Sequence, residues 1–198
     1  MIDFHILHRH NQQSPHINEA IASLTGYKTF IVADQPSFME ARVKAFHLGN
    51  SPYVSYCDDD DAVMNIPYVL EQLIGTKADA LYTNSEIFVN KQIGTFFPTD
   101  YVHDRTKILS RDTRTHQLQV IRRDLAQDAA NIVVSKLPHR LQWCFDYALQ
   151  LQVTYWTDWI YLSEPCYKWR LWNSKIQTHY ECTHAMMIET FHMVKSWQ

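Results

Sequence analysis

An alternation of strand-like and helix-like segments in the first 82 residues is the feature that most restricts the fold of this chain. Short apolar runs predict strands at residues 4–7, 29–33, 53–57 and 78–82. Between them, apolar residues at helical spacing predict helices near residues 17–24, 38–46 and 67–74. Strands that alternate with helices build βαβ units, so we expect an α/β fold with a mainly parallel central sheet flanked by helices. The carboxyl ends of its strands should form the ligand-binding edge.

The second half of the chain is less regular. Residues 90–115 are polar and rich in turn formers, which is typical of a functional or disordered loop. Beyond them we expect a strand at 116–121, helices at 125–137, 139–151 and 183–197, and short aromatic strands at 159–162 and 166–171. The last two strands predict a short second β element in the C-terminal half.

Composition excludes several common classes of protein. Four glycines among 198 residues argue against a dinucleotide-binding fold, and neither G-x-G-x-x-G nor G-x-x-x-x-G-K-[ST] occurs. The formal net charge of −3 predicts no general affinity for polyanions. The four cysteines are scattered and fit free thiols. No signal-peptide pattern and no apolar run of membrane-spanning length is visible, so we expect a cytoplasmic protein, or one of the host cytoplasm if it is viral.

The most informative segment is a run of four aspartates, residues 58–61, directly after the third predicted strand. Like charges this close together are costly unless a cation neutralises them. Mg²⁺ and Mn²⁺ prefer carboxylate oxygens and leave coordination positions for phosphates. A carboxylate pair at the carboxyl end of a parallel strand therefore suits a complex of metal and diphosphate. The alternative is a solvated acidic turn that caps the following helix.

Several segments, in order along the chain, resemble the family-2-type glycosyltransferases, which have the GT-A fold. Residues 4–11 are similar to the family's strand segment ending in Pro-Thr-Tyr-Asn, and Asn11 matches the last residue of that ending. Residues 31–34 resemble the strand that ends in an aspartate holding the nucleotide base, and residues 42–46 resemble the helix before the third strand. The aspartate run matches the family's D-x-D motif as Asp58-x-Asp60.

Two later segments extend the resemblance over nearly the whole chain. Residues 145–151 are similar to the Glu-Asp-Tyr-x-Leu-x-Leu helix start that carries the family's catalytic base, and Asp146 matches that base. Residues 162–170 resemble the family's segment Ile-Pro-Glu-Pro-Leu-Tyr-x-Tyr-Arg. Trp172 stands where the family has a histidine, so the resemblance supplies no histidine metal ligand.

The resemblance implies one GT-A-like domain over residues 1–198, with a nucleotide-sugar-binding half at 1–89 and an acceptor-side half at 90–198. It implies a glycosyltransferase that depends on Mn²⁺ or Mg²⁺ and moves a sugar from a nucleoside-diphosphate sugar to an acceptor hydroxyl with inversion. Metal ligation is expected from Asp60 and Asp58, and general-base catalysis from Asp146. The residues implied for donor and nucleotide binding are His8, Arg9, His10, Asp34, Asp58, Asp59 and Arg170.

Two of these assignments have structural alternatives. Asp146 could instead be a helix N-terminal charge or a paired aspartate beneath an aromatic layer. Arg170 could bind either a donor phosphate or a structural carboxylate.

The acceptor-side prediction concerns a basic segment at residues 105–123, whose cations are Arg105, Lys107, Arg111, Arg114, Arg122 and Arg123. One interpretation is a solvated loop and strand edge. The other is a mobile, basic surface for an anionic acceptor or for the donor phosphates. The acceptor could be a glycan or a modified nucleic-acid base, as in phage enzymes that glycosylate modified bases.

Two other functions compete with sugar transfer. A nucleotidyltransferase acting on a sugar phosphate also uses a βαβ half and metal-binding aspartates, but it usually has a glycine-rich phosphate loop that residues 7–14 lack. A non-catalytic interaction module on the same fold would need neither Asp60 nor Asp146.

Overall fold

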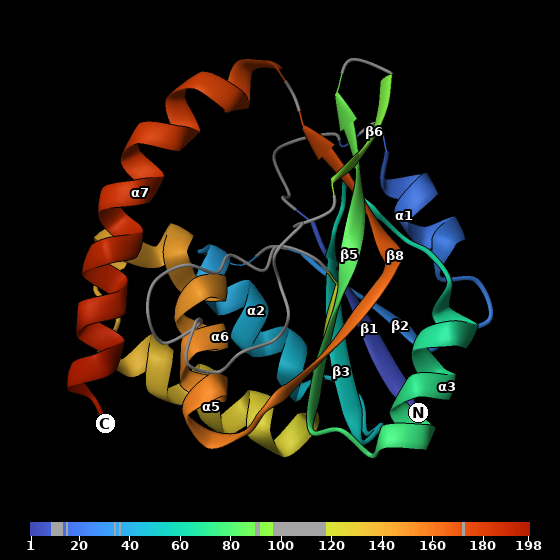
Figure 1. Cartoon of the computed structure of the whole chain (residues 1–198), viewed down its shortest axis with the longest axis horizontal. Coiled ribbons are helices and arrows are strands. Elements are labelled where there is room, and N and C mark those ends of the chain that lie inside the picture. The colour runs from blue at the N-terminus through green and yellow to red at the C-terminus, as the bar shows by residue number, and fades with distance from the viewer. Residues whose placement is uncertain are drawn as a thin grey trace.

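The computed structural model describes residues 1–8, 14, 16–33, 35, 37–89, 92–96, 118–171 and 173–198 (Figure 1). Within these residues, one eight-stranded mixed sheet carries helices on both faces. None of the described helices has the length and apolar character that crossing a membrane requires.

The order of strands in the sheet is β2-β1-β3-β7-β5-β8-β4, and β6 pairs with β5 beyond the end of β7. β2, β1, β3, β5 and β8 run in one direction, whereas β7, β4 and β6 run in the other. The strands are β1 (Ile2–Leu7), β2 (Thr29–Val32), β3 (Tyr53–Asp58), β4 (Ala62–Val63), β5 (Ala80–Val89), β6 (Gln92–Phe96), β7 (Gln119–Arg122) and β8 (Trp159–Leu171).

The helices form two layers, one on each face of the sheet (Figure 1). One layer holds α1 (Ile17–Ser23) and α3 (Ile66–Thr76). The other holds α2 (Phe38–His47), α5 (Arg123–Lys136), α6 (Phe145–Trp156) and the outermost helix, α7 (Asn173–Ser196). A 3-10 helix, η1 (His139–Cys144), leads directly into α6.

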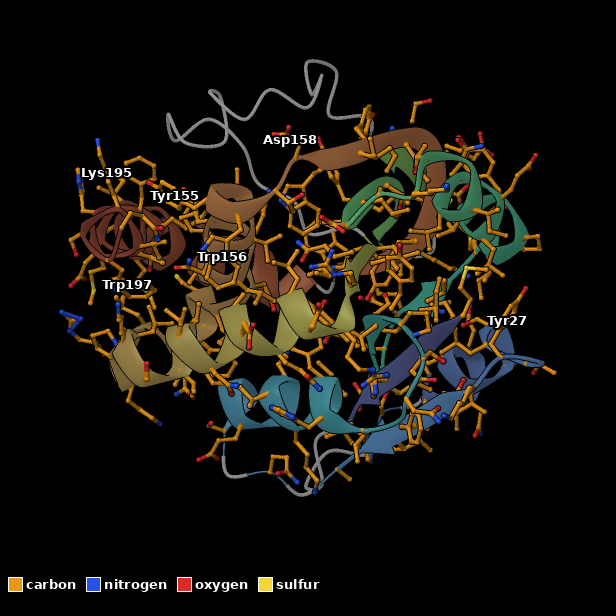
Figure 2. All side chains as sticks on the ribbon, turned by 90° about the horizontal axis from the view of Figure 1, so that it is seen from below. Tyr27, Tyr155, Trp156, Asp158, Lys195 and Trp197 are labelled. Atoms are coloured by element: carbon orange, nitrogen blue, oxygen red, sulfur yellow. The ribbon has the colours of Figure 1, made fainter. Side chains whose placement is uncertain are left out.

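Each face of the sheet has its own apolar core. On the α1 and α3 side, Phe4 and Leu81 of the sheet pack with Val69 of α3. On the other side, Tyr82 and Trp159 of the sheet pack in a cluster with residues of α2, α5, α6 and α7. Figure 2, seen from below, places Tyr155 and Trp156 of α6 on the same side of the molecule as Trp197, with Tyr27 on the opposite side. Because both faces of the sheet are covered, polar residues of the central strands, such as Asp3 and His5 of β1 and Ser55 of β3, are buried as well.

The structure confirms the predicted α/β class and corrects several predicted boundaries. α1 covers Ile17–Ser23, one residue less than predicted, with His16 as its N-cap. α3 was predicted to end at residue 74, but it continues through Gly75 to Thr76, and Lys77 takes the left-handed conformation. The two short aromatic strands are one strand, β8, which pairs with β5 across register shifts.

A buried carboxylate fixes the chain where α2 leads into β3. Asp3 is fully buried, accepts hydrogen bonds from the backbone N–H groups of Asn50 and Ser51, and forms an ion pair with Arg123. Gly49 has a φ of +85°, and a Cβ at this position would lie 2.1 Å from Oδ2 of Asp3. Only glycine meets both demands, the left-handed backbone and the approach of the carboxylate.

Gly49→Ala should therefore lower the free energy of unfolding by about 3 kcal/mol or more, because backbone strain adds to disruption of a buried ion pair. Gly26→Ala is the matched control, since Gly26 has a φ of +87° with nothing within 4 Å of the added Cβ. It should lose only about 1–2 kcal/mol, the cost of the left-handed conformation. Urea denaturation measures both losses, and equal losses would mean that the Asp3 carboxylate does not constrain this turn.

Candidate functional site

The acidic run lies at the carboxyl end of β3, at the edge of the sheet where the parallel strands end. Asp58 is the last residue of β3, and the backbone N–H of Asp61 donates to the carbonyl of Asp58 over 3.1 Å, which closes a tight turn. β4 follows this turn, and α3 begins only at Ile66 with Asn65 as its N-cap. The alternative interpretation, in which the aspartates cap the next helix, is therefore wrong.

Asp59 is bound to the first strand's end. Its carboxylate Oδ2 lies 2.6 Å from Nδ1 of His8, and its backbone N–H donates to the carbonyl of Leu7. The hydroxyl of Ser14 donates to its backbone carbonyl over 2.9 Å. The predicted donor residues His8 and Asp59 therefore do meet, and they contact each other directly.

Asp61 is buried, and two residues of β8 donate hydrogen bonds to its carboxylate. Its Oδ2 accepts a hydrogen bond from the hydroxyl of Tyr167 over 2.8 Å, and its Oδ1 accepts one from the backbone N–H of Arg170 over 2.8 Å. Burial raises the pKa of the Asp61 carboxyl well above its usual value, and the nearby Asp58 and Asp60 carboxylates add to this. With both oxygens engaged inside the protein, Asp61 serves the fold.

Asp58 and Asp60 are the two aspartates of the run that hold the D-x-D spacing, and both are only partly buried. Burial raises the pKa of the Asp58 carboxyl to about 6; the carboxylates of Asp146, Asp60 and Asp59 add to the rise, and Arg42 opposes it. A divalent cation would favour the charged form of such crowded carboxylates, so the donor chemistry fits Mg²⁺ or Mn²⁺.

Within the described part of the chain, no group of three or more His, Cys, Asp or Glu side chains could hold a metal ion.

Asp146 is the second residue of α6, and its carboxylate is held in a fixed orientation. Arg42 donates to it from Nε and from Nη2, the latter over 2.9 Å, and the hydroxyl of Tyr56 donates to its Oδ1 over 2.8 Å. The Asp146 side chain is 15% exposed, so it still reaches the surface. The paired-aspartate alternative thus has a structural basis, and it remains compatible with a catalytic carboxylate.

Arg42 joins the two parts of the candidate site. Its guanidinium is fully buried, its Nη2 lies 3.5 Å from Oδ1 of Asp58, and its Cζ lies 4.6 Å from the centre of the Tyr56 ring. Sequence reasoning assigned no role to this residue. One signal was present, because Arg42 follows Met39 by three residues and precedes Phe46 by four, which places it in the apolar stripe of α2.

The side chain of Arg170 meets a carboxylate in the structure. It forms an ion pair with Glu19 of α1, whose other oxygen accepts from Lys168 over 2.7 Å. The structural-carboxylate alternative therefore has an observed partner, and phosphate binding by Arg170 stays a prediction.

Other predicted residues lie outside the described part of the chain, namely Arg9, His10, Asp34 and most of the basic segment. Arg122 and Arg123 are described, and Arg122 pairs with Tyr53, at the opposite end of β3 from Asp58. Arg122 pairs with Asp79 and Asp124, and Arg123 pairs with the buried Asp3. These two arginines therefore pair with carboxylates of the fold, and an acceptor-side role for the basic segment stays a prediction.

No protein-family model matches the sequence, and no curated protein sequence matches it significantly. Among solved structures, the fold is similar to that of S. aureus TarS. For TarS 1–349 the TM-score is 0.64 at 16% identity, covering 95% of this chain and 64% of that one. Another TarS structure gives a TM-score of 0.63 at 14% identity, covering 95% of this chain and 39% of that one. TarS 1–349 in complex with UDP-GlcNAc gives 0.63 at 13% identity, covering 86% and 58% of the two chains. The similarity establishes a GT-A-like fold.

The bridge between Arg42 and Asp146 generates a stability prediction. Arg42→Met should destabilise the protein by about 3 kcal/mol, because it leaves a mostly buried carboxylate without its cation. The double variant Arg42→Met/Asp146→Leu should recover much of that loss, since an apolar pair replaces an ion pair at little cost. Arg140→Met is the control, because Arg140 pairs with Glu189 on the surface and should cost less than about 1 kcal/mol. Urea denaturation of the wild type and the three variants measures these differences. If the double variant were the least stable of the four, the predicted coupling between Arg42 and Asp146 would be wrong.

Proposed function

We propose that this protein is a metal-dependent glycosyltransferase that moves a sugar from a nucleoside-diphosphate sugar to an acceptor hydroxyl. The observation that carries the proposal is the convergence of Asp58, Asp146 and Arg42 at the carboxyl edge of a GT-A-like sheet. A donor-side carboxylate and a candidate base are thus linked by one guanidinium. TarS, which shares the fold, has been solved with UDP and with UDP-GlcNAc, so UDP-sugars are the first donors to test.

The donor side of the proposed site is the acidic turn. Asp60 and Asp58 would hold Mn²⁺ or Mg²⁺, which when bound neutralises the diphosphate and stabilises it as a leaving group. His8 and Asp59, already in contact, would border the nucleotide, and Arg9, His10 and Asp34 are expected beside them. Asp59 would act mainly by holding His8, because one of its oxygens is 2.6 Å from the imidazole.

The acceptor side of the proposed site is Asp146. The acceptor oxygen would attack the anomeric carbon while the bond from that carbon to the diphosphate oxygen breaks, and the hydroxyl proton would pass to Asp146. Oδ1 accepts from both Arg42 and Tyr56, whereas Oδ2 accepts from Arg42 alone among the described residues. Oδ2 therefore has the lone pair that would take the proton. A single displacement of this kind inverts the anomeric configuration.

The acceptor itself is proposed only by class. A glycan hydroxyl and a hydroxyl on a modified nucleic-acid base are both compatible with a solitary carboxylate base at a partly exposed position. If residues 105–117 contribute positive charge, use of an anionic acceptor will weaken as salt concentration rises.

The proposed metal site predicts that Asp60→Ala abolishes Mn²⁺-dependent binding of UDP while the protein stays folded. Calorimetric titration of UDP with and without Mn²⁺ measures the effect. Asp128→Asn is the control, since Asp128 is an exposed carboxylate on α5 and should leave binding unchanged. If Asp60→Ala bound UDP with the affinity and the Mn²⁺ dependence of the wild type, the metal-site proposal would be wrong.

The proposed general base predicts that Asp146→Asn binds UDP and Mn²⁺ as the wild type does but loses about 10²–10⁴-fold in turnover. Tyr56→Phe is the matched control, because it removes one hydrogen bond to the same carboxylate and leaves the base in place. It should retain most of the turnover. Near-normal turnover by Asp146→Asn, or a product whose anomeric configuration by NMR matches the donor, would count against the mechanism.

A further inference from the structure

The hydroxyl of Tyr167 connects β8 to both ends of the acidic turn. It accepts a hydrogen bond from the backbone N–H of Asp58 over 3.2 Å and donates one to Oδ2 of Asp61 over 2.8 Å. Tyr167 is 5% exposed, so bulk water does not substitute for either partner. One buried oxygen therefore contacts the residue that starts the turn and the residue that ends it.

Backbone contacts strengthen the same connection. Tyr167 lies opposite Val63 in the antiparallel pairing of β4 with β8, and the N–H of Met64 donates to the carbonyl of Cys166 over 2.9 Å. The N–H of Arg170 donates to the other oxygen of Asp61. β4 has only two residues, so β8 and the Tyr167 hydroxyl supply much of what holds the turn in place.

We propose that Tyr167 is a positioning residue for the donor site, which fixes the backbone of Asp58 and thereby the direction of its carboxylate, with Asp61 as its fixed acceptor. This inference rests on the proposed function, because it assigns Asp58 to the donor side. In this role Tyr167 would contact neither the sugar nor the acceptor. It acts through the main chain of Asp58 and through the buried Asp61, and Asp60 lies between these two fixed points.

Removal of the Tyr167 hydroxyl alone distinguishes a positioning role from a packing role. Phenylalanine fills nearly the same volume in the apolar cluster to which Tyr167 belongs, so Tyr167→Phe keeps the packing and removes both hydrogen bonds. A residue that only packs would show little change in ligand binding. A residue that positions the turn would show weaker Mn²⁺-dependent binding in a protein that is still folded.

The test is calorimetric titration of UDP with Mn²⁺ at a temperature well below the melting transition of every variant. Tyr167→Phe should bind about three- to tenfold more weakly, the fold-change expected from the loss of about one hydrogen bond's net free energy. Affinity for UDP in the presence of EDTA should not change. Tyr161→Phe is the control, because it removes a hydroxyl from the same strand where its ring packs against Tyr82, and it should bind as the wild type does.

Asp61→Asn tests the same unit from the other side. The amide keeps an oxygen for the N–H of Arg170 but places an N–H donor opposite the Tyr167 hydroxyl, whose own proton then loses its acceptor. The same three- to tenfold loss is expected, and the double variant should lose less than the product of the two single losses, because both act on one contact.

The possible outcomes separate the two proposals. A wild type that shows no Mn²⁺-dependent binding of UDP or UDP-GlcNAc overturns the proposed function, and the positioning role falls with it. A wild type that binds, together with folded Tyr167→Phe and Asp61→Asn proteins of unchanged affinity, overturns the positioning role alone. If neither variant folds, amide exchange in the wild type decides, since the Asp58 N–H should exchange slowly when bound to Tyr167 and rapidly if this contact is absent.

Discussion

The candidate site is arranged around the ion pair between Arg42 and Asp146, in which the Arg42 guanidinium has almost no access to water. Arg42 comes from α2, Asp146 from the start of α6, and the ring of Tyr56 on β3 lies against the guanidinium. A charge this deeply buried is tolerated only with a partner, so the pair fixes how two helices lie on one face of the sheet. Because Arg42 also reaches Asp58, the same contact sets the spacing between the acidic turn and the candidate base. Stability and the proposed chemistry therefore depend on one interaction.

The four consecutive aspartates are chemically alike, but the fold gives them different environments. Asp59 meets His8, and Asp61 is buried against Tyr167 and the N–H of Arg170. Asp58 and Asp60 keep the alternate spacing that the proposed metal site uses. The structure thus explains how a run of like charges can be stable in the folded protein, since each member has partners or solvent, and a cation would stabilise it further.

Local patterns were sufficient to predict the fold class and the location of the acidic turn. Both depend on short segments, because strand–helix alternation and a strand ending in aspartates are visible within a few residues. The contacts of the site depend on residues far apart in sequence, so they could not be predicted. Arg42 was assigned no role, and only its spacing from Met39 and Phe46 indicated that it lies on the buried face of α2. Tyr167 belonged to a recognised segment, yet nothing in that segment indicated which backbone group its hydroxyl would bind. The end of α3 was misplaced because Gly75 fits a helix interior and Lys77 adopts the left-handed conformation.

The position of β7 has a consequence for the order of folding. This four-residue strand lies between β3 and β5 and pairs with both, although it follows β5 in the chain. On the ribosome, β3 would therefore have an open edge while β5 is already synthesised, and the sheet could not become continuous until residues 119–122 had left the exit tunnel. Such late insertion of a central strand raises the contact order and exposes a strand edge to intermolecular pairing during synthesis. The nascent chain is thus most exposed to aggregation before its second half is complete, and a chaperone would be of most use during that interval.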